Sequence, residues 1–263
     1  MQMRNAGMST DLAADEVAAV LADRPVRSYP ALLSTETVAM AWAREGAPHG
    51  AVVVADYQVS PRGRGGLPWK VTPGHSLGFT VLLRPDDLSP EREGWPYVAS
   101  SLAITDVVGG PAVGLEWPDT VLTEKSALTL ASIGVHVELV PLRTEWLTVT
   151  VLVRNTKPPR APLLAPLVIA LERRLSAPPD TVLAAYRERC TTLGRQVRAR
   201  MIPMGPGGPE LTGEAVDVLA DGALVLLTAR GSRVAVRPQN LGLLEAPEGP
   251  IESPDVVLGA DLR

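Results

Sequence analysis

Apolar residues recur along this chain with two different spacings, which separate expected helices from expected strands. Over residues 10–23 and 34–46 they return every three or four positions, a spacing that predicts two short helices. Residues 51–55 and 77–83 are nearly continuous apolar runs, which are typical of strands buried on both faces. The first third of the chain is therefore expected to alternate helices with buried strands.

The remaining two thirds change character twice. A small-residue helix is expected over 98–108, alternating strands fill 120–153, and two further helices follow over 167–175 and 181–193. After Gly194 the chain reads as short strands separated by Gly- and Pro-containing links, with an Asp-Gly hairpin signal at 221–222. These patterns predict an α+β fold, a mixed β-sheet flanked by helices, followed by a small C-terminal β-barrel.

The same changes suggest four segments. Residues 1–25 form an N-terminal extension with a short helix, and residues 26–194 form the main domain. Residues 195–246 form the small barrel, and the Pro- and Gly-containing stretch 247–263 is a flexible tail.

Composition narrows the class of protein. Hydrophobic residues make up 46% of 263, enough for a substantial core, and the formal charge of −4 gives no general attraction for nucleic acid or anionic membranes. Cys190 is the only cysteine, so an intramolecular disulfide or a multi-cysteine metal site is excluded. No apolar run approaches the roughly 20 residues of a membrane span, and no signal peptide is evident. We expect a soluble, cytoplasmic protein with no bound metal of its own.

One loop concentrates the candidate chemistry. Residues 58–69 read Gln-Val-Ser-Pro-Arg-Gly-Arg-Gly-Gly-Leu-Pro-Trp. Glycines let a backbone approach a ligand, and Arg62 and Arg64 add two cations suited to a phosphate or a carboxylate. The alternative is a solvated glycine-rich hairpin without a ligand, and composition alone does not separate the two.

The order of motifs resembles that of the biotin–protein ligases. The strand end Ala55-Asp56-Tyr57-Gln58, the Arg-Gly-Arg loop and Trp69 are similar to the family's glycine/arginine loop. Upstream, Ser34-Thr35 is similar to its Ser-Thr-Asn motif, and downstream Glu116-Trp117-Pro118-Asp119 is similar to its Lys-Trp-Pro-Asn-Asp motif. The resemblance covers roughly residues 26–245, and it implies a class II synthetase-like ligase core with an SH3-like barrel.

The resemblance also implies an activity. ATP would activate biotin, or a related carboxylic acid, as an acyl-adenylate, and a lysine of an acceptor carboxylase domain would then take the acyl group. Mg²⁺ would accompany the ATP. Three residues would be catalytic, namely Arg62, Arg64 and Lys125. Seven would contact the ligands: Ser34, Thr35, Gln58, Gly63, Gly66, Trp69 and Trp117.

Several positions depart from the family pattern. Glu36 replaces the asparagine of the Ser-Thr-Asn motif, and Glu116 replaces the lysine that leads the Trp-Pro motif. Val149 and Val151 stand where the family has glycines, and we expect them to fill part of the nucleotide pocket. Two alternatives therefore stay open: a catalytically silent binding protein with the ligase fold, and an acyltransferase that uses a preactivated acyl donor.

The family resemblance also implies which binding partners the protein has. About 25 residues precede the first core strand, which leaves no room for the winged-helix DNA-binding domain of the family's dual-function members. We therefore expect no nucleic-acid partner and no membrane partner. The expected partners are a small carboxylic acid, a biotin-acceptor carboxylase domain and a second copy of the chain in a homodimer.

Overall fold

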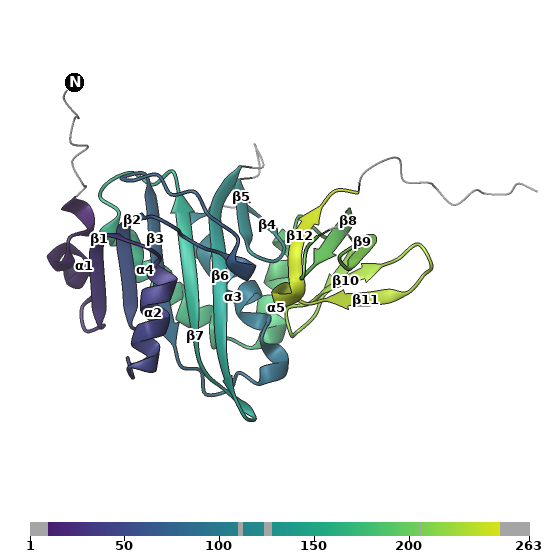
Figure 1. The fold of residues 1–263 in the computed structure, drawn as a ribbon, viewed down its shortest axis with the longest axis horizontal. Coiled ribbons are helices and arrows are strands. Elements are labelled where there is room, and N and C mark those ends of the chain that lie inside the picture. The colour runs from purple at the N-terminus through teal and green to yellow at the C-terminus, as the bar shows by residue number, and fades with distance from the viewer. Residues whose placement is uncertain (1–9, 110–112, 124–127, 206, 248–263) are drawn as a thin grey trace, which may run out of the picture.

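A computed structural model describes residues 10–109, 113–123, 128–205 and 207–247. Its main feature is a seven-stranded mixed sheet in the order β1-β2-β3-β7-β6-β5-β4 (Figure 1). The strands β1 and β2 pair in parallel, and the other neighbours pair antiparallel. The strand bounds are β1 Val26–Leu32, β2 Val52–Gln58, β3 Ser76–Leu83, β4 Val113–Glu116, β5 Thr120–Thr123, β6 Thr129–Val140 and β7 Arg143–Arg154.

In the part of the chain that the structure describes, five α-helices accompany this sheet. They are α1 Ala14–Leu21, α2 Thr35–Arg44, α3 Trp95–Val108, α4 Leu164–Leu175 and α5 Pro179–Arg189. Short 3-10 turns occur as η1 Thr10–Leu12, η2 Arg64–Gly66, η3 Pro90–Arg92, η4 Ala161–Leu163 and η5 Pro238–Asn240. No helix in these described ranges is long and apolar enough to span a lipid bilayer. The mixed sheet flanked by helices confirms the expected α+β fold.

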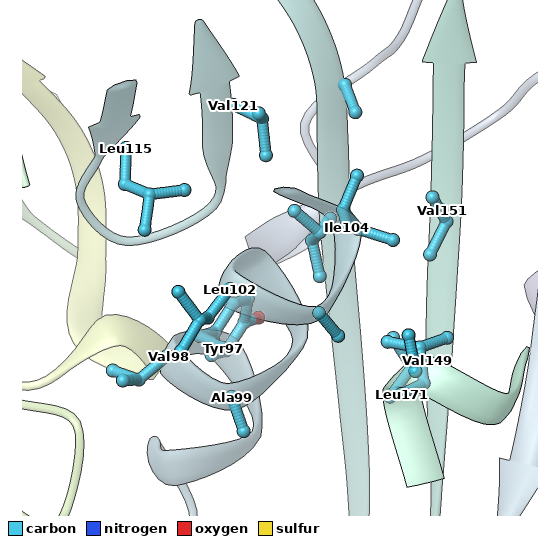
Figure 2. Packing of buried hydrophobic residues seen from close by; sticks show 14 of the residues in the cluster. Tyr97, Val98, Ala99, Leu102, Ile104, Leu115, Val121, Val149, Val151 and Leu171 are labelled. Atoms are coloured by element: carbon cyan, nitrogen blue, oxygen red, sulfur yellow. The ribbon is translucent and has the colours of Figure 1, made fainter. Parts of the chain in front are cut away.

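The two faces of the sheet are covered differently. On one face α3 and α4 bury alternate strand residues, including Val149 and Val151, against Ile104 and Leu171 (Figure 2). On the other face α2 forms a smaller apolar cluster with Leu82 and Trp146. Polar side chains on that second face, among them Thr80, Thr148 and Thr150, mark the candidate site. We call this second face the site face.

A second sheet follows the main one. It is antiparallel, in the order β11-β10-β9-β8-β12, with bounds β8 Gln196–Met201, β9 Glu210–Val218, β10 Leu224–Leu227, β11 Arg233–Val236 and β12 Leu241–Glu245. We call residues 196–245 the C-terminal module. The expected small β-domain is present, but its edge strands β11 and β12 are not hydrogen-bonded neighbours, so this described sheet is open rather than a closed barrel.

Candidate functional site

Two predicted ligand-binding residues meet at the start of α2. The carboxamide oxygen Oε1 of Gln58, at the end of β2, accepts hydrogen bonds from the backbone N–H of Thr35 at 2.9 Å and from its hydroxyl at 3.2 Å. All three residues of this corner, including Ser34, are buried. The Ser34 hydroxyl is buried without a hydrogen-bond partner among the described residues. A buried hydroxyl in this state costs free energy, so it is suited to receive a polar ligand atom.

The polar network continues across the sheet through residues that the sequence did not single out. The Thr80 hydroxyl lies 2.9 Å from the Thr35 hydroxyl and 2.9 Å from the Thr150 hydroxyl. Thr80 on β3 and Thr150 on β7 are register partners, so their side chains lie on the same face. The buried Thr148 hydroxyl, further along the same face of β7, has no partner in the described chain. The site face therefore holds a connected row of buried polar groups.

The predicted pocket blockers lie elsewhere. Val149 and Val151 alternate with Thr148 and Thr150 along β7, so they point to the opposite face and pack into the helix-covered core (Figure 2). The expectation that these two valines fill the nucleotide pocket is wrong, because neither side chain is on the site face.

The glycine/arginine loop lies over this face. Gly134 on β6, the register partner of Thr150, is so close to the loop that an added Cβ would sit 3.2 Å from the Cα of Gly63. A Cβ on Gly63 would in turn lie 2.3 Å from Nε1 of Trp69. Close approach favours glycine at both positions, and more strongly at Gly63. The loop thus lies between the sheet and the half-buried Trp69, as a covering segment would.

The loop is more ordered internally than its composition suggested. The backbone N–H groups of Gly63, Gly66 and Leu67 donate to carbonyls within the loop, and that of Trp69 donates to Pro61. These amides are therefore not all presented to a ligand. Gly66 adopts φ +76°, a conformation that favours glycine, and its carbonyl accepts from Arg62 at 2.9 Å.

The two loop arginines have different surroundings. Arg62 is exposed and contacts only its own loop among the hydrogen bonds of the described residues. Arg64 is buried, and its Nε donates to Oδ2 of Asp119 at 2.9 Å. Of the two loop arginines, only Arg62 therefore presents its guanidinium to solvent beside the site face.

Two other predicted site residues remain to be placed. Trp117 is fully buried, it lines a small cavity with Arg64 and Trp69, and its indole N–H donates to the carbonyl of Gly222 in the C-terminal module at 3.0 Å. Its side chain therefore joins the two sheets. Lys125 lies outside the described residues.

A basic cavity extends the site face at the end of β7. It has a volume of about 690 Å³, and its lining includes Lys70, His75, Arg154 and Lys157. The described lining residues include no carboxylate. Arg154 Nε and Thr156 Oγ1 are buried without hydrogen-bond partners in the described chain. Arg154 is four positions beyond Thr150, about 13 Å along a strand, so the cavity lies roughly one small-ligand length from the threonines.

Glu36 adds a titratable group beside the loop. Burial raises the pKa of its carboxyl from an ordinary value near 4.5 to about 7, and the nearby Arg62 guanidinium offsets part of that rise. The pKa of Glu36 is higher in the folded state than in the unfolded state, so proton binding by its carboxyl favours folding. This contribution to the free energy of unfolding is complete below pH 4.5 and is lost as the pH rises through 7.

Glu36→Gln should therefore stabilise the protein only at high pH. At pH 8 we expect the free energy of unfolding to rise by up to about 3 kcal/mol, and at pH 4.5 to stay close to wild type. Urea unfolding at both pH values measures this, with the exposed Glu188→Gln as a control. An equal gain at both pH values would contradict a half-buried Glu36 that titrates between them.

Comparison with known proteins gives the chain its family. No family model matches the sequence. The biotin–[acetyl-CoA-carboxylase] ligase of Mycobacterium tuberculosis is 30% identical over 216 residues, covering 73% of this chain and 79% of that protein.

Solved structures agree on the fold. The Aquifex aeolicus biotin protein ligase in complex with biotin and ATP aligns with a TM-score of 0.63 at 19% identity, over 85% of this chain and 99% of that one. A biotin protein ligase-like protein of unknown function from Silicibacter sp. TM1040 aligns with a TM-score of 0.61 at 13% identity, over 82% and 95%. The sequence match, the fold and the ordered motifs together show that this chain belongs to the biotin–[acetyl-CoA-carboxylase] ligase family.

Proposed function

We propose that this protein is a biotin–protein ligase that activates biotin, or a related carboxylic acid, with ATP and transfers it to a protein lysine. In the first step a carboxylate oxygen of the acid bonds to the α-phosphorus of ATP and pyrophosphate leaves. In the second step the lysine amine attacks the acyl carbon of the mixed anhydride and AMP leaves. Mg²⁺, bound with the nucleotide, would supply positive charge that offsets the charge of the phosphates.

The observation that carries the proposal is the arrangement of the site face. A buried polar corner (Ser34, Thr35 and Gln58) and a basic cavity at the end of β7 lie along one face of the sheet. A few fixed polar groups in a buried corner suit an apolar ligand with a polar head. A cavity rich in Lys and Arg suits phosphates. Such a pair of subsites fits an acid and a nucleotide that react with each other.

Each group of the chain then has a defined task. The Ser34, Thr35 and Gln58 side chains orient the acid, and the glycines Gly63 and Gly66 let the loop backbone approach it. Arg62 supplies a mobile, solvated cation for the phosphate charge that develops during adenylation. Trp69 covers the loop. Lys125 is proposed, on its sequence position alone, to stabilise the reacting carboxylate.

Two matched substitutions test the two subsites separately. Thr35→Val should weaken biotin binding and leave ATP binding unchanged, whereas Arg154→Gln should do the reverse. Each removes a contact worth roughly 1–3 kcal/mol, so the affected dissociation constant should rise about 5- to 150-fold. Calorimetric titration with each ligand measures both constants.

The exposed Arg233→Gln on β11 is the control, and it should change neither constant. Loss of both affinities in both variants, with native stability retained, would contradict two separate subsites. Binding of neither biotin nor ATP by the wild type would contradict the proposed function itself.

The acceptor is proposed to be a biotin-carboxylase carrier domain, because the proposed second step needs an accessible protein lysine. A homodimer and a cytoplasmic location are proposed as well. Analytical ultracentrifugation tests the homodimer, and cell fractionation tests the location.

A further inference from the structure

The two arginines of the loop differ in what they contact, although they are two residues apart. Arg62 is exposed, and its Nη1 donates to the Gly66 carbonyl within the loop. The Arg64 side chain is 6% exposed and reaches away from the loop to two other parts of the chain. From the sequence alone, both arginines are expected to be phosphate ligands. In the structure their surroundings differ.

Arg64 joins three segments that are distant in sequence. Its Nε donates to Oδ2 of Asp119, which follows the Trp117-Pro118 motif, at 2.9 Å. Its Nη1 donates to the backbone carbonyl of Leu241, the first residue of β12 in the C-terminal module. One guanidinium therefore connects the loop, the Trp-Pro motif and the C-terminal module.

A second contact joins the loop to the same module. Gly65, which has φ +60°, lies so close to Ile202 that an added Cβ would be 3.3 Å from its Cδ1 atom. The loop turn η2 and the module turn η5 are also in contact. The attachment of the loop to the C-terminal module is therefore not limited to a single hydrogen bond.

Asp119 holds Arg64 in this arrangement. The carboxylate is largely buried, and burial raises its pKa, while the charge of Arg64 and its hydrogen bond act in the opposite direction. A phosphate that took Arg64 for itself would leave this buried carboxylate without its cation, which is costly. Arg62 forms no such ion pair among the described residues: it donates to the Gly66 carbonyl of its own loop and lies near the Glu36 carboxyl without a hydrogen bond to it. Arg62 is therefore the cation that a phosphate can engage at lower cost.

We propose that Arg64 is a positioning residue that fastens the glycine/arginine loop to the C-terminal module, and that it is not a phosphate ligand. Through it the module holds the loop over the site face. The inference rests on the proposed function only where it assigns the loop to a ligand. Its test uses the protein without any ligand.

Hydrogen exchange of the full chain, without ligand, is the test. Four loop amides serve as reporters because they donate within the loop: those of Gly63, Gly66, Leu67 and Trp69. Arg64→Gln should accelerate their exchange on the order of tenfold or more, because a hydrogen-bonded charge is lost. The segment 238–245 of the module should exchange faster in the same variant. Arg62→Gln, the matched control, should leave both segments close to wild type.

Two further variants separate positioning from a general loss of structure. Arg64→Lys keeps the charge but lacks the planar fork that makes both contacts, so the exchange should be intermediate. Asp119→Asn keeps the shape and weakens the hold on Arg64, so the loop and segment 238–245 should again exchange faster together. In each case exchange of the central strands β3 and β7 should stay unchanged.

Some outcomes would overturn the inference. One is loop exchange in Arg64→Gln and Asp119→Asn that equals wild type. Another is an equal effect of Arg62→Gln and Arg64→Gln, which would make the two arginines equivalent. A protein that binds neither biotin nor ATP would refute the proposed function, yet these exchange results would still decide whether Arg64 fastens the loop.

Discussion

Arg160→Met is expected to lower the free energy of unfolding by about 3–5 kcal/mol, the largest stability loss that we predict for a single side chain. Arg160 is fully buried, and its Nη2 atom lies 2.6 Å from Oδ1 of Asp11 and 2.6 Å from Oδ1 of Asp56. Its Nη1 donates to the Ser76 carbonyl at 2.9 Å. Removing the cation leaves the Asp56 carboxylate buried without its charge partner.

Urea unfolding measures this loss. The control is Arg173→Gln, which breaks a contact to Asp106 from a side chain that is 63% exposed and should cost less than about 1 kcal/mol. Adding Asp56→Asn to Arg160→Met should restore part of the stability, because the buried group is then neutral. A loss below about 1 kcal/mol for Arg160→Met alone would show that the cluster is not a structural centre of the fold.

Arg62→Gln is expected to slow acyl-adenylate formation by about two orders of magnitude. Arg62 is the exposed cation beside the site face, and a charge-assisted contact to a developing phosphate charge is worth roughly 3 kcal/mol in the transition state. The rate of pyrophosphate release at saturating ATP and biotin measures this effect.

The control for Arg62→Gln is Arg230→Gln, an exposed arginine between β10 and β11 that should leave the rate unchanged. Because Arg62 is exposed and donates to a carbonyl of its own loop only, among the described hydrogen bonds, the variant should keep close to wild-type stability. An unchanged rate in a folded Arg62→Gln protein would remove Arg62 from the proposed mechanism.

Local patterns predicted much of the fold. The helix predicted over residues 34–46 corresponds to α2, and the strands predicted at 51–55 and 77–83 correspond to β2 and β3. The motif order also brought Thr35 and Gln58 together, in direct hydrogen-bond contact. These features depend on residues close in sequence or on a family pattern, so the sequence carries them.

Features that depend on strand register could not be predicted in this way. Thr80 and Thr150 are 70 positions apart, and their contact exists only because β3 and β7 pair in one register. The same register turns Val149 and Val151 to the helix side, and a shift of one residue would exchange the two faces. The sequence gives both sets the same alternating pattern and does not say which face holds the site.

Contacts between the main sheet and the C-terminal module also could not be predicted from the sequence. The family resemblance assigns Trp117 a ligand contact, and it gives no sign that the indole N–H donates to Gly222, more than a hundred positions away. The short strand β4 was not predicted, since four residues carry too little periodicity. The open edge of the C-terminal module likewise depends on how far β11 and β12 lie apart, which no local pattern encodes.

The most direct test of the central claim is pyrophosphate release by the wild-type protein with ATP, in the presence and absence of biotin. A ligase should release pyrophosphate only when biotin is present, about a hundredfold more slowly in Arg62→Gln, and should then transfer biotin to a carrier-domain lysine. Lipoate and other short acids serve as alternative substrates. If no acid elicits pyrophosphate release from a protein that binds both biotin and ATP, the protein is a silent member of the family and not a ligase.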